Sequence, residues 1–214
     1  MTVSKTSPTP SGWREARRRD ARADLLSTAW EIVREDGLGG LSLRDLARRA
    51  GITTPTVYAY FESKNAIFDA MFGEAAQNFA EMKAEPLEGD DPQVNLVTEA
   101  QRFLEFCTSD VARYQLLFQH LLPGFTPSPE SYASAVRALE LTRARLVRNG
   151  VRDPAHHDIW TALLTGLVDQ QIANDPGGDR WSRLVDEVVA MFLAHCASVP
   201  NTAVSPTDQV APTR

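Results

Sequence analysis

The amino-acid sequence predicts an all-α protein with a small N-terminal helical head and a larger helical body. Apolar residues recur at three- and four-residue spacing along the long segments, and no segment sustains the alternation typical of a strand. The segment Leu41–Lys64 divides into two short helices around a glycine turn. The chain has 214 residues, of which 43% are hydrophobic, which suffices for one large or two small domains.

The first predicted helix runs from about Trp13 to Glu35 and ends at Asp36-Gly37. Its first turns are crowded with cations, which oppose the helix dipole, and neutralisation of phosphates is a physical reason to accept that penalty. Because acidic residues are interleaved, the alternative is a solvated charged end. The arginines concerned are Arg14, Arg17, Arg18, Arg19 and Arg22.

Helix-turn-helix signals follow directly. Ser42 is the expected N-cap of the next helix, and the carboxylate of Asp45 can bind the free N–H groups of its first turn. Gly51 ends that helix, since the sharp turn needs a residue that tolerates positive φ. Thr53 or Thr54 then caps a second helix with Pro55 in its first turn. A motif of this kind places its second helix in the DNA major groove.

The run GITTPTVYAYF from Gly51 to Phe61, followed by Ser63-Lys64, resembles the recognition-helix signature of the TetR family of bacterial transcriptional regulators. The resemblance continues upstream in register to Ala21. It implies a three-helix helix-turn-helix DNA-binding domain, here residues 13–62, and a helical effector-binding and dimerisation domain, residues 63–198. We expect the tails, residues 1–12 and 199–214, to be disordered.

The resemblance also implies which residues contact DNA. In such proteins the hydroxyl at the position of Tyr60 and the ammonium at that of Lys64 hold phosphates. Arg44 begins the second helix, where the family touches a phosphate or a base edge. Val57 and Phe61 are expected in the core. The expected DNA contacts are Arg14, Arg17, Arg18, Ser42, Arg44, Thr53, Thr54, Pro55, Thr56, Tyr58, Ala59, Tyr60 and Lys64.

Two of these positions depart from the family pattern. Thr54 stands where many members carry Lys or Arg, and Ala59 stands where many carry His, Asn or Arg. Both changes weaken direct hydrogen-bond readout. Specificity then depends more on Arg44, Thr56 and DNA shape, or the protein binds less tightly. Tyr58 suits packing and a contact to thymine methyl or phosphate equally well.

The charge distribution agrees with a head that meets DNA. Net charge is −6, but residues 1–64 carry 11 basic and 8 acidic residues, whereas residues 65–214 carry 11 and 20. A basic head on an acidic body favours nucleic acid at one end only. No apolar N-terminal run predicts a signal peptide, and no long apolar stretch predicts a membrane span, so we expect a cytoplasmic protein.

The sequence contains no catalytic signature: no GxSxG, no Walker loop and no metal-ligand cluster. We therefore expect no catalytic residues, metal or cofactor. His156-His157 do not suggest a metal site, because adjacent residues on a helix point about 100° apart. Cys107 and Cys196 are expected to be small buried hydrophobes. A protein–protein adaptor would fit the acidic body but not the arginine cluster.

Further helices are predicted in the body at about 63–83, 93–108, 111–121, 130–149, 154–173 and 179–197. The last two carry apolar residues at steps of four, on faces broad enough for their own core and for a partner. In TetR-like proteins these helices form the interface of a homodimer, and two-fold symmetry suits a palindromic operator. The interface candidates are Ile159, Leu163, Leu164, Leu167, Val168, Leu184, Val185, Val188, Val189 and Phe192.

The resemblance further implies a small-molecule effector, bound between the body helices in a mostly apolar pocket. The candidates are Phe103, Phe106, Cys107, Tyr114, Phe118, His120, Tyr132, Trp160 and Gln170, with Gln171 beside them. The residues favour an apolar, aromatic effector only weakly. The expected mechanism is a repressor that the effector releases from DNA through the helix at 63–83. An activator or a corepressor-dependent repressor remains an alternative.

Overall fold

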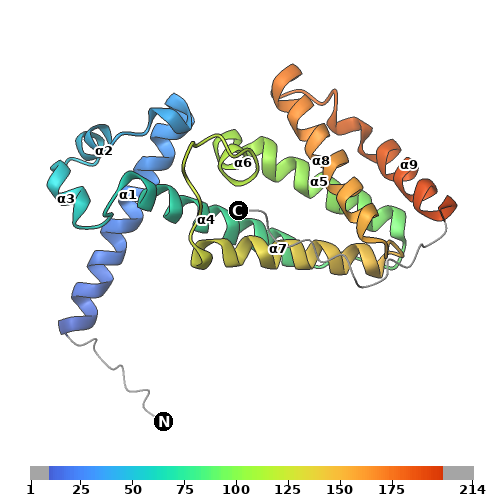
Figure 1. The fold of residues 1–214 in the computed structure, drawn as a ribbon, viewed down its shortest axis with the longest axis horizontal. Coiled ribbons are helices and arrows are strands. Elements are labelled where there is room, and N and C mark those ends of the chain that lie inside the picture. The colour runs from blue at the N-terminus through green and yellow to red at the C-terminus, as the bar shows by residue number, and fades with distance from the viewer. Residues whose placement is uncertain (1–9, 200–214) are drawn as a thin grey trace, which may run out of the picture. The chain divides into compact units, whose positions relative to one another are not determined.

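The computed structural model describes residues 10–199, and every regular element of this range is helical, which confirms the predicted all-α class. Figure 1 shows the elements in chain order. They are α1 (Pro10–Gly40), α2 (Leu43–Arg49), α3 (Thr54–Tyr58), α4 (Lys64–Ala84), α5 (Pro92–Ser109), α6 (Val111–Phe118), α7 (Pro129–Arg148), α8 (Pro154–Asn174), the 3-10 helix η1 (Ser182–Leu184) and α9 (Val185–Ser198).

The described chain divides into two compact units. The first comprises residues 10–78 and 110–135, and the second comprises residues 79–109 and 136–199. Helices α4 and α7 begin in the first unit and end in the second. The predicted tails lie outside the described residues, except that α1 takes in residues 10–12 and residue 199 follows α9.

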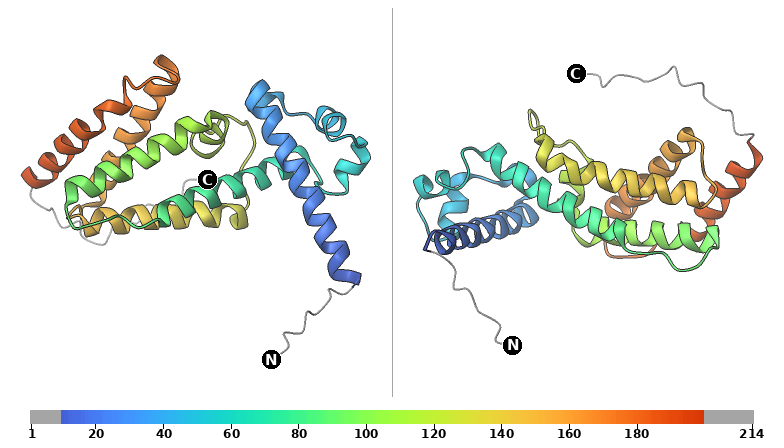
Figure 2. Two further views of the ribbon diagram at one scale, coloured as in Figure 1. Left: turned by 180° about the vertical axis from the view of Figure 1, so that it is seen from behind. Right: turned by 90° about the horizontal axis from the view of Figure 1, so that it is seen from below.

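In the first unit, α1 packs against α2 and α6, and α2 packs against α3 (Figures 1 and 2). The core formed there includes the apolar stripe of α1 and the buried face of α4. Val57 and Phe61 are 0% and 2% exposed, which confirms their expected place in the core. The short helix α3 is therefore held by side chains on either side of its C-terminal end.

The turns around α2 form as the sequence predicts. Helix α1 loses helical geometry at Gly37, where φ is 74° and ψ is 170°. The Ser42 hydroxyl accepts a hydrogen bond from the Asp45 N–H at 3.1 Å and caps α2. Gly51, with φ of 68°, turns the chain after α2. The Asp45 carboxylate differs from expectation, because it accepts hydrogen bonds from Arg48 and Arg49.

The N-cap of α3 is Thr53, not Thr54. Its hydroxyl accepts a hydrogen bond from the Thr56 N–H at 3.4 Å and pairs with the Thr56 hydroxyl at 2.8 Å. Pro55 lies in the first turn, where its missing N–H leaves no hydrogen bond unmade. The caps matter here because a five-residue helix has almost no hydrogen-bonded ladder of its own.

In the second unit, α8 and α9 pack against α5 and against each other (Figure 2). Asp153 caps α8 through the Ala155 N–H, as its Asp-Pro start signal predicts. Helix α6 ends at Phe118, before the predicted Leu121, and the Pro-rich loop follows it.

The predicted start of the last helix at Asp179 is wrong, since α9 begins at Val185. The buried side chain of Gln171 holds the preceding turn: its Oε1 accepts from the Trp181 and Ser182 N–H groups at 2.9 and 3.1 Å. An Asp175 carboxylate oxygen accepts from the Arg180 N–H. Because these N–H groups are bound by side chains, the segment enters a 3-10 turn first. Gln171 is thus a structural residue.

We predict that Gly51→Ala destabilises the protein by about 1–2 kcal/mol, because an L side chain is strained at this positive φ. Gly39→Ala is the matched control: its φ is ordinary and an added Cβ meets open space. Urea unfolding of both variants measures the difference. Equal loss of stability in the two variants would contradict the assigned turn geometry.

Candidate nucleic-acid interface

The exposed surface of α3 and its C-cap combines small side chains with one large side chain, Tyr58. Pro55 and Ala59 are exposed, and Thr54 and Thr56 are partly exposed. Since the Thr53 and Thr56 hydroxyls pair with each other, a base or phosphate contact from either competes with that pair. The capacity of these two threonines to bind a further partner is therefore modest.

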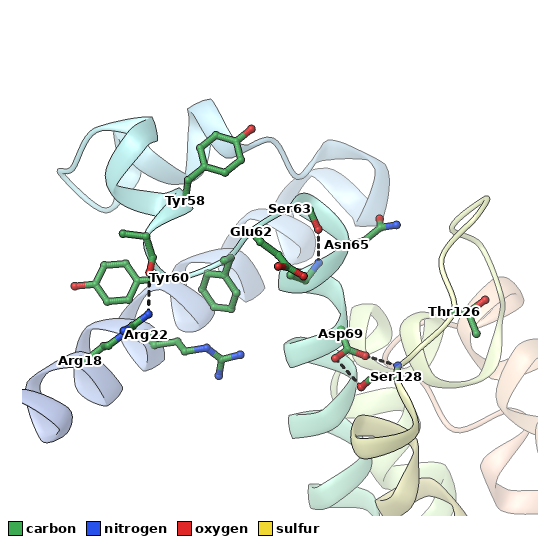
Figure 3. Close-up of a pocket in the computed structure, with 13 residues that line it drawn as sticks. Arg18, Arg22, Tyr58, Tyr60, Glu62, Ser63, Asn65, Asp69, Thr126 and Ser128 are labelled. Carbon is green, nitrogen blue, oxygen red and sulfur yellow. Dashed lines mark hydrogen bonds between the residues drawn. The ribbon is translucent and has the colours of Figure 1, made fainter.

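Arg18 of α1 joins α1 to the end of α3. Its guanidinium donates a hydrogen bond to the Ala59 carbonyl at 3.1 Å (Figure 3). A cation at this carbonyl complements the negative end of the helix. The Arg17 guanidinium lies 3.8 Å from the centroid of the Trp13 ring, a cation–π contact on the same exposed stretch. The basic stretch of α1 is thus ordered by contacts within the head.

An open hollow of about 590 Å³ lies beside α3, as Figure 3 shows. Arg18 and Arg22 come from α1, and Asn65 and Asp69 come from the start of α4. The Arg22 guanidinium lies 4.7 Å from the centroid of the buried Phe61 ring. The full lining is Arg18, Arg22, Tyr58, Ala59, Tyr60, Phe61, Glu62, Ser63, Asn65, Ala66, Asp69, Thr126 and Ser128.

Tyr58 is the last residue of α3, and Tyr60 follows it by two positions. Their side chains point to different sides (Figure 3). Tyr58 is 53% exposed, so it does not pack in the core of the described chain. Tyr60 is partly buried and lines the hollow. Lys64 starts α4 with its ammonium 5.4 Å from the centroid of the Phe68 ring. Arg44 is exposed, with no ion pair among residues 10–199.

Arg48 and Arg49 are engaged within the head. Arg49 forms ion pairs with Glu35, Asp36 and Asp45 at 2.6, 3.4 and 2.9 Å, and Arg48 binds Asp45. The hydrogen bond from Arg48, followed by that from Arg49, holds the pKa of Asp45 below its usual 3.8. The Glu35 hydrogen bond raises the pKa of Arg49. This network ties α1 to α2 and leaves Arg44 as the free cation of α2 within the described residues.

The structure therefore brings the expected DNA contacts together in the first unit, and all are at least partly exposed. The hollow adds Asn65, Thr126 and Ser128, which sequence reasoning did not single out. Ser128 is held there by the Asp69 carboxylate, which accepts from its N–H at 2.6 Å and its hydroxyl at 2.9 Å. Only the fold reveals this proximity, because 59 positions separate the two residues.

The nine effector candidates are distributed over both units. Neither described hollow is lined by any of them. In the first unit, Tyr114 contacts Phe118, Tyr132 stacks on Phe72, and His120 is exposed. The remaining candidates lie in the second unit. Phe103 and Phe106 pack on Phe79, Trp160 packs on Phe192, Cys107 is buried, and Gln170 is exposed and accepts from Asn174.

The ten interface candidates divide by exposure. Ile159 and Leu163 are 38% and 37% exposed, one helical turn apart on α8, and Leu184 and Val188 are partly exposed. Met191, which sequence reasoning did not include, is 65% exposed on α9. The others are buried in the chain's own core: Leu164, Leu167, Val168, Val185, Val189 and Phe192.

The capped α3, the glycine turn before it and the exposed residues around it define a helix-turn-helix protein. Residues 25–71 match the family model described as bacterial regulatory proteins, tetR family. EthR from Mycolicibacterium smegmatis is 41% identical to this chain over 69 residues, which cover 31% of this chain and 32% of EthR. The likeness to the tetR family thus covers the head of the chain, residues 25–71.

Solved structures share the fold over most of the chain. A TetR-family transcriptional regulator from Streptomyces coelicolor has a TM-score of 0.64 and 19% identity, covering 84% of this chain and 82% of its own. FadR from Bacillus subtilis, solved in complex with stearoyl-CoA, has a TM-score of 0.58 and 17% identity, covering 80% and 97%. The chain spans 32% to 54% of the length of the curated relatives it matches first.

Within residues 10–199, no helix is both long and apolar enough to span a bilayer. The same residues contain no cluster of three or more His, Cys, Asp or Glu side chains able to hold a metal ion.

We predict that Arg49→Ala lowers the urea midpoint of unfolding, whereas Arg44→Ala leaves it unchanged, because only Arg49 is engaged by three carboxylates. The deficit should depend on pH. Since the folded state lowers the pKa of Asp45, the stabilisation is present above pH 3.8 and is lost as pH falls through the folded pKa. A deficit that persists unchanged at the lowest pH would show that Asp45 is not the essential partner.

Proposed function

We propose that this protein is a sequence-specific, DNA-binding transcriptional regulator of the bacterial cytoplasm. It acts as a homodimer that represses transcription from a palindromic operator, and a small-molecule effector releases it. The observation that carries the proposal is the exposed, doubly capped helix-turn-helix, whose sequence matches the family model over residues 25–71.

The arrangement of donors around α3 supports phosphate contact on both sides of the helix. Arg44 lies before it on α2, and Tyr60 and Lys64 lie after it. Each of the three is at least partly exposed. In DNA recognition such contacts fix the register of the protein, while the side chains of the helix itself read bases. With Thr54, Pro55 and Ala59 on that surface, readout depends on methyl contacts and DNA shape.

The apolar surface of α8 and α9 supports the dimer. Ile159, Leu163 and Met191 are large apolar side chains that the chain's own core leaves exposed. Two such helices from each copy would bury these residues in a self-complementary contact. A two-fold dimer presents two heads, as a palindromic operator requires.

Two observations support an effector. One is the family resemblance, and the other is the solved structure of FadR, which is similar in fold and holds stearoyl-CoA. An effector releases DNA only to the extent that it binds the DNA-free conformation more tightly.

The first test is selection of binding sequences from a random duplex library with the full chain, followed by binding at rising salt. We expect a palindrome to be enriched and the affinity to fall steeply with salt concentration, as counterion release requires. Recovery of no enriched sequence, or binding that ignores salt, would reject sequence-specific DNA binding by this protein.

We predict that Tyr60→Phe weakens operator binding about tenfold through loss of one hydrogen bond to a charged phosphate. Lys64→Ala should weaken binding on all sequences and reduce the salt slope by about 1. Tyr132→Phe and Arg143→Ala, exposed residues on α7, are the matched controls. If Tyr60→Phe and Lys64→Ala bind like their controls, the docking geometry is wrong. A repeat of the library selection with Arg44→Ala separates base readout, which alters the sequence preference, from phosphate contact, which does not.

We predict that Leu163→Glu and Met191→Glu convert the dimer to monomer, because each places a charge on the apolar contact. Val94→Glu changes an equally apolar residue of α5 that is 55% exposed, and it should leave the dimer intact. Sedimentation velocity distinguishes the two species. If both α8 and α9 variants remain dimeric, the interface lies elsewhere.

A further inference from the structure

A buried ion cluster lies in the second unit, where the end of α4 meets α5 and α7. The Glu99 carboxylate binds the Lys83 ammonium with one oxygen and the Arg145 guanidinium with the other. Glu99 is 1% exposed and Lys83 is 2% exposed. Two cations therefore share one buried carboxylate.

The Cys107 thiol beside the cluster does not supply a negative charge. Burial raises the pKa of the Cys107 thiol, so that the thiol beside Lys83 stays neutral. Burial also lowers the pKa of Lys83, a shift that Glu99 opposes. The Phe79 and Phe103 rings lie 5.3 Å from the Lys83 ammonium and offer only cation–π attraction. Because an uncompensated buried cation is costly, the cluster favours the arrival of an anion.

The cluster opens onto a cavity of about 220 Å³. Three cationic side chains line it, Lys83, Arg145 and Arg148, together with two amides and four apolar residues, and no acidic residue lines it. At its rim the Arg148 side chain is 63% exposed and pairs with Asp90 at 3.3 Å, whose own side chain is 98% exposed. An exposed pair of this kind is weak and can exchange Asp90 for another anion. The cavity is lined by Lys83, Ala84, Pro86, Leu87, Asn95, Leu141, Arg145, Arg148 and Asn149.

An independent observation points to a ligand in the same cavity. Asn95 is 3% exposed, and its side-chain Nδ2 donates a hydrogen bond to the side-chain Oδ1 of Asn149 at 3.0 Å. Its Oδ1 is buried and accepts no hydrogen bond from any described residue. A buried acceptor without a donor costs free energy, so a donor on a bound molecule would be favoured here.

We propose that this cavity binds a small organic carboxylate that also carries a hydroxyl or amine donor. The carboxylate meets the guanidinium groups of Arg145 and Arg148, and the donor meets Oδ1 of Asn95. Three cationic side chains and no acidic residue line the cavity, which favours an anion over a neutral molecule. The volume lies below the roughly 300–1,000 Å³ of cavities for drug-sized ligands, which favours a small metabolite.

That this carboxylate acts as the effector rests on the proposed function, whereas its binding does not. We therefore test binding first, with the full chain and no DNA, by calorimetric titration of glycolate, lactate and mandelate. We expect saturable binding by at least one of these 2-hydroxycarboxylates. Mandelamide, which lacks the charge, and phenylacetate, which lacks the hydroxyl, should each bind at least tenfold more weakly than mandelate if mandelate is the probe that binds.

Arg148→Gln removes a rim cation without touching the buried cluster, and it should weaken carboxylate binding severalfold. Arg143→Gln is the matched control, because Arg143 is exposed on the same helix and does not line the cavity. Leu141→Trp should fill the cavity and abolish binding. Three results would each overturn the site: no saturable binding by any of the three hydroxycarboxylates, equal binding of the neutral amide, or equal affinity of the two arginine variants.

Operator binding is then measured with and without the bound carboxylate. Reduced operator affinity supports its role as effector. Unchanged affinity leaves the carboxylate site in place and removes its link to DNA release. A chain that binds no operator overturns the proposed function and leaves the calorimetric result intact.

Discussion

The recognition helix depends on its surroundings more than on its own sequence. A helix of five residues is too short to be stable in water, so α3 exists only because both ends are held. The Thr53 cap holds its start, and buried Val57 and Phe61 hold its end in the core of the first unit. Arg18 then binds the carbonyl of Ala59 where the helix stops. The exposed surface of α3 is thus a consequence of packing in the head.

Arginines that look alike in the sequence have different tasks. Arg48 and Arg49 are neighbours of Arg44 along α2, yet carboxylates of the head engage them and leave Arg44 exposed. In the buried ion cluster of the second unit, cations outnumber the carboxylates that bind them. Lys83 and Arg145 compete for the single carboxylate of Glu99. In the head, enough carboxylates are present to pair Arg48 and Arg49, which stabilise the fold. In the second unit, the shortage of carboxylates is the basis for the proposed binding of an anion.

The described cavity of the second unit differs in its lining from the apolar, aromatic pocket that was expected. The aromatic residues pack in pairs that fill space, such as Phe79 with Phe106 and Trp160 with Phe192. The described cavity of the second unit is instead lined by cations and amides. Composition cannot separate these cases, because an aromatic side chain in a core and one in a pocket carry the same helical periodicity.

The sequence by itself determined the local features. It determined the all-α class, the Ser42 cap, the glycine turn, the Asp153 cap and the family resemblance of the head, because each depends on residues a few positions apart. Tertiary structure decided what needs distant residues. It chose Thr53 as the cap of α3, delayed α9 through Gln171, and sorted the α8 and α9 stripes into core and surface. It also joined Lys83, Glu99 and Arg145, since no local pattern specifies which buried charges will meet.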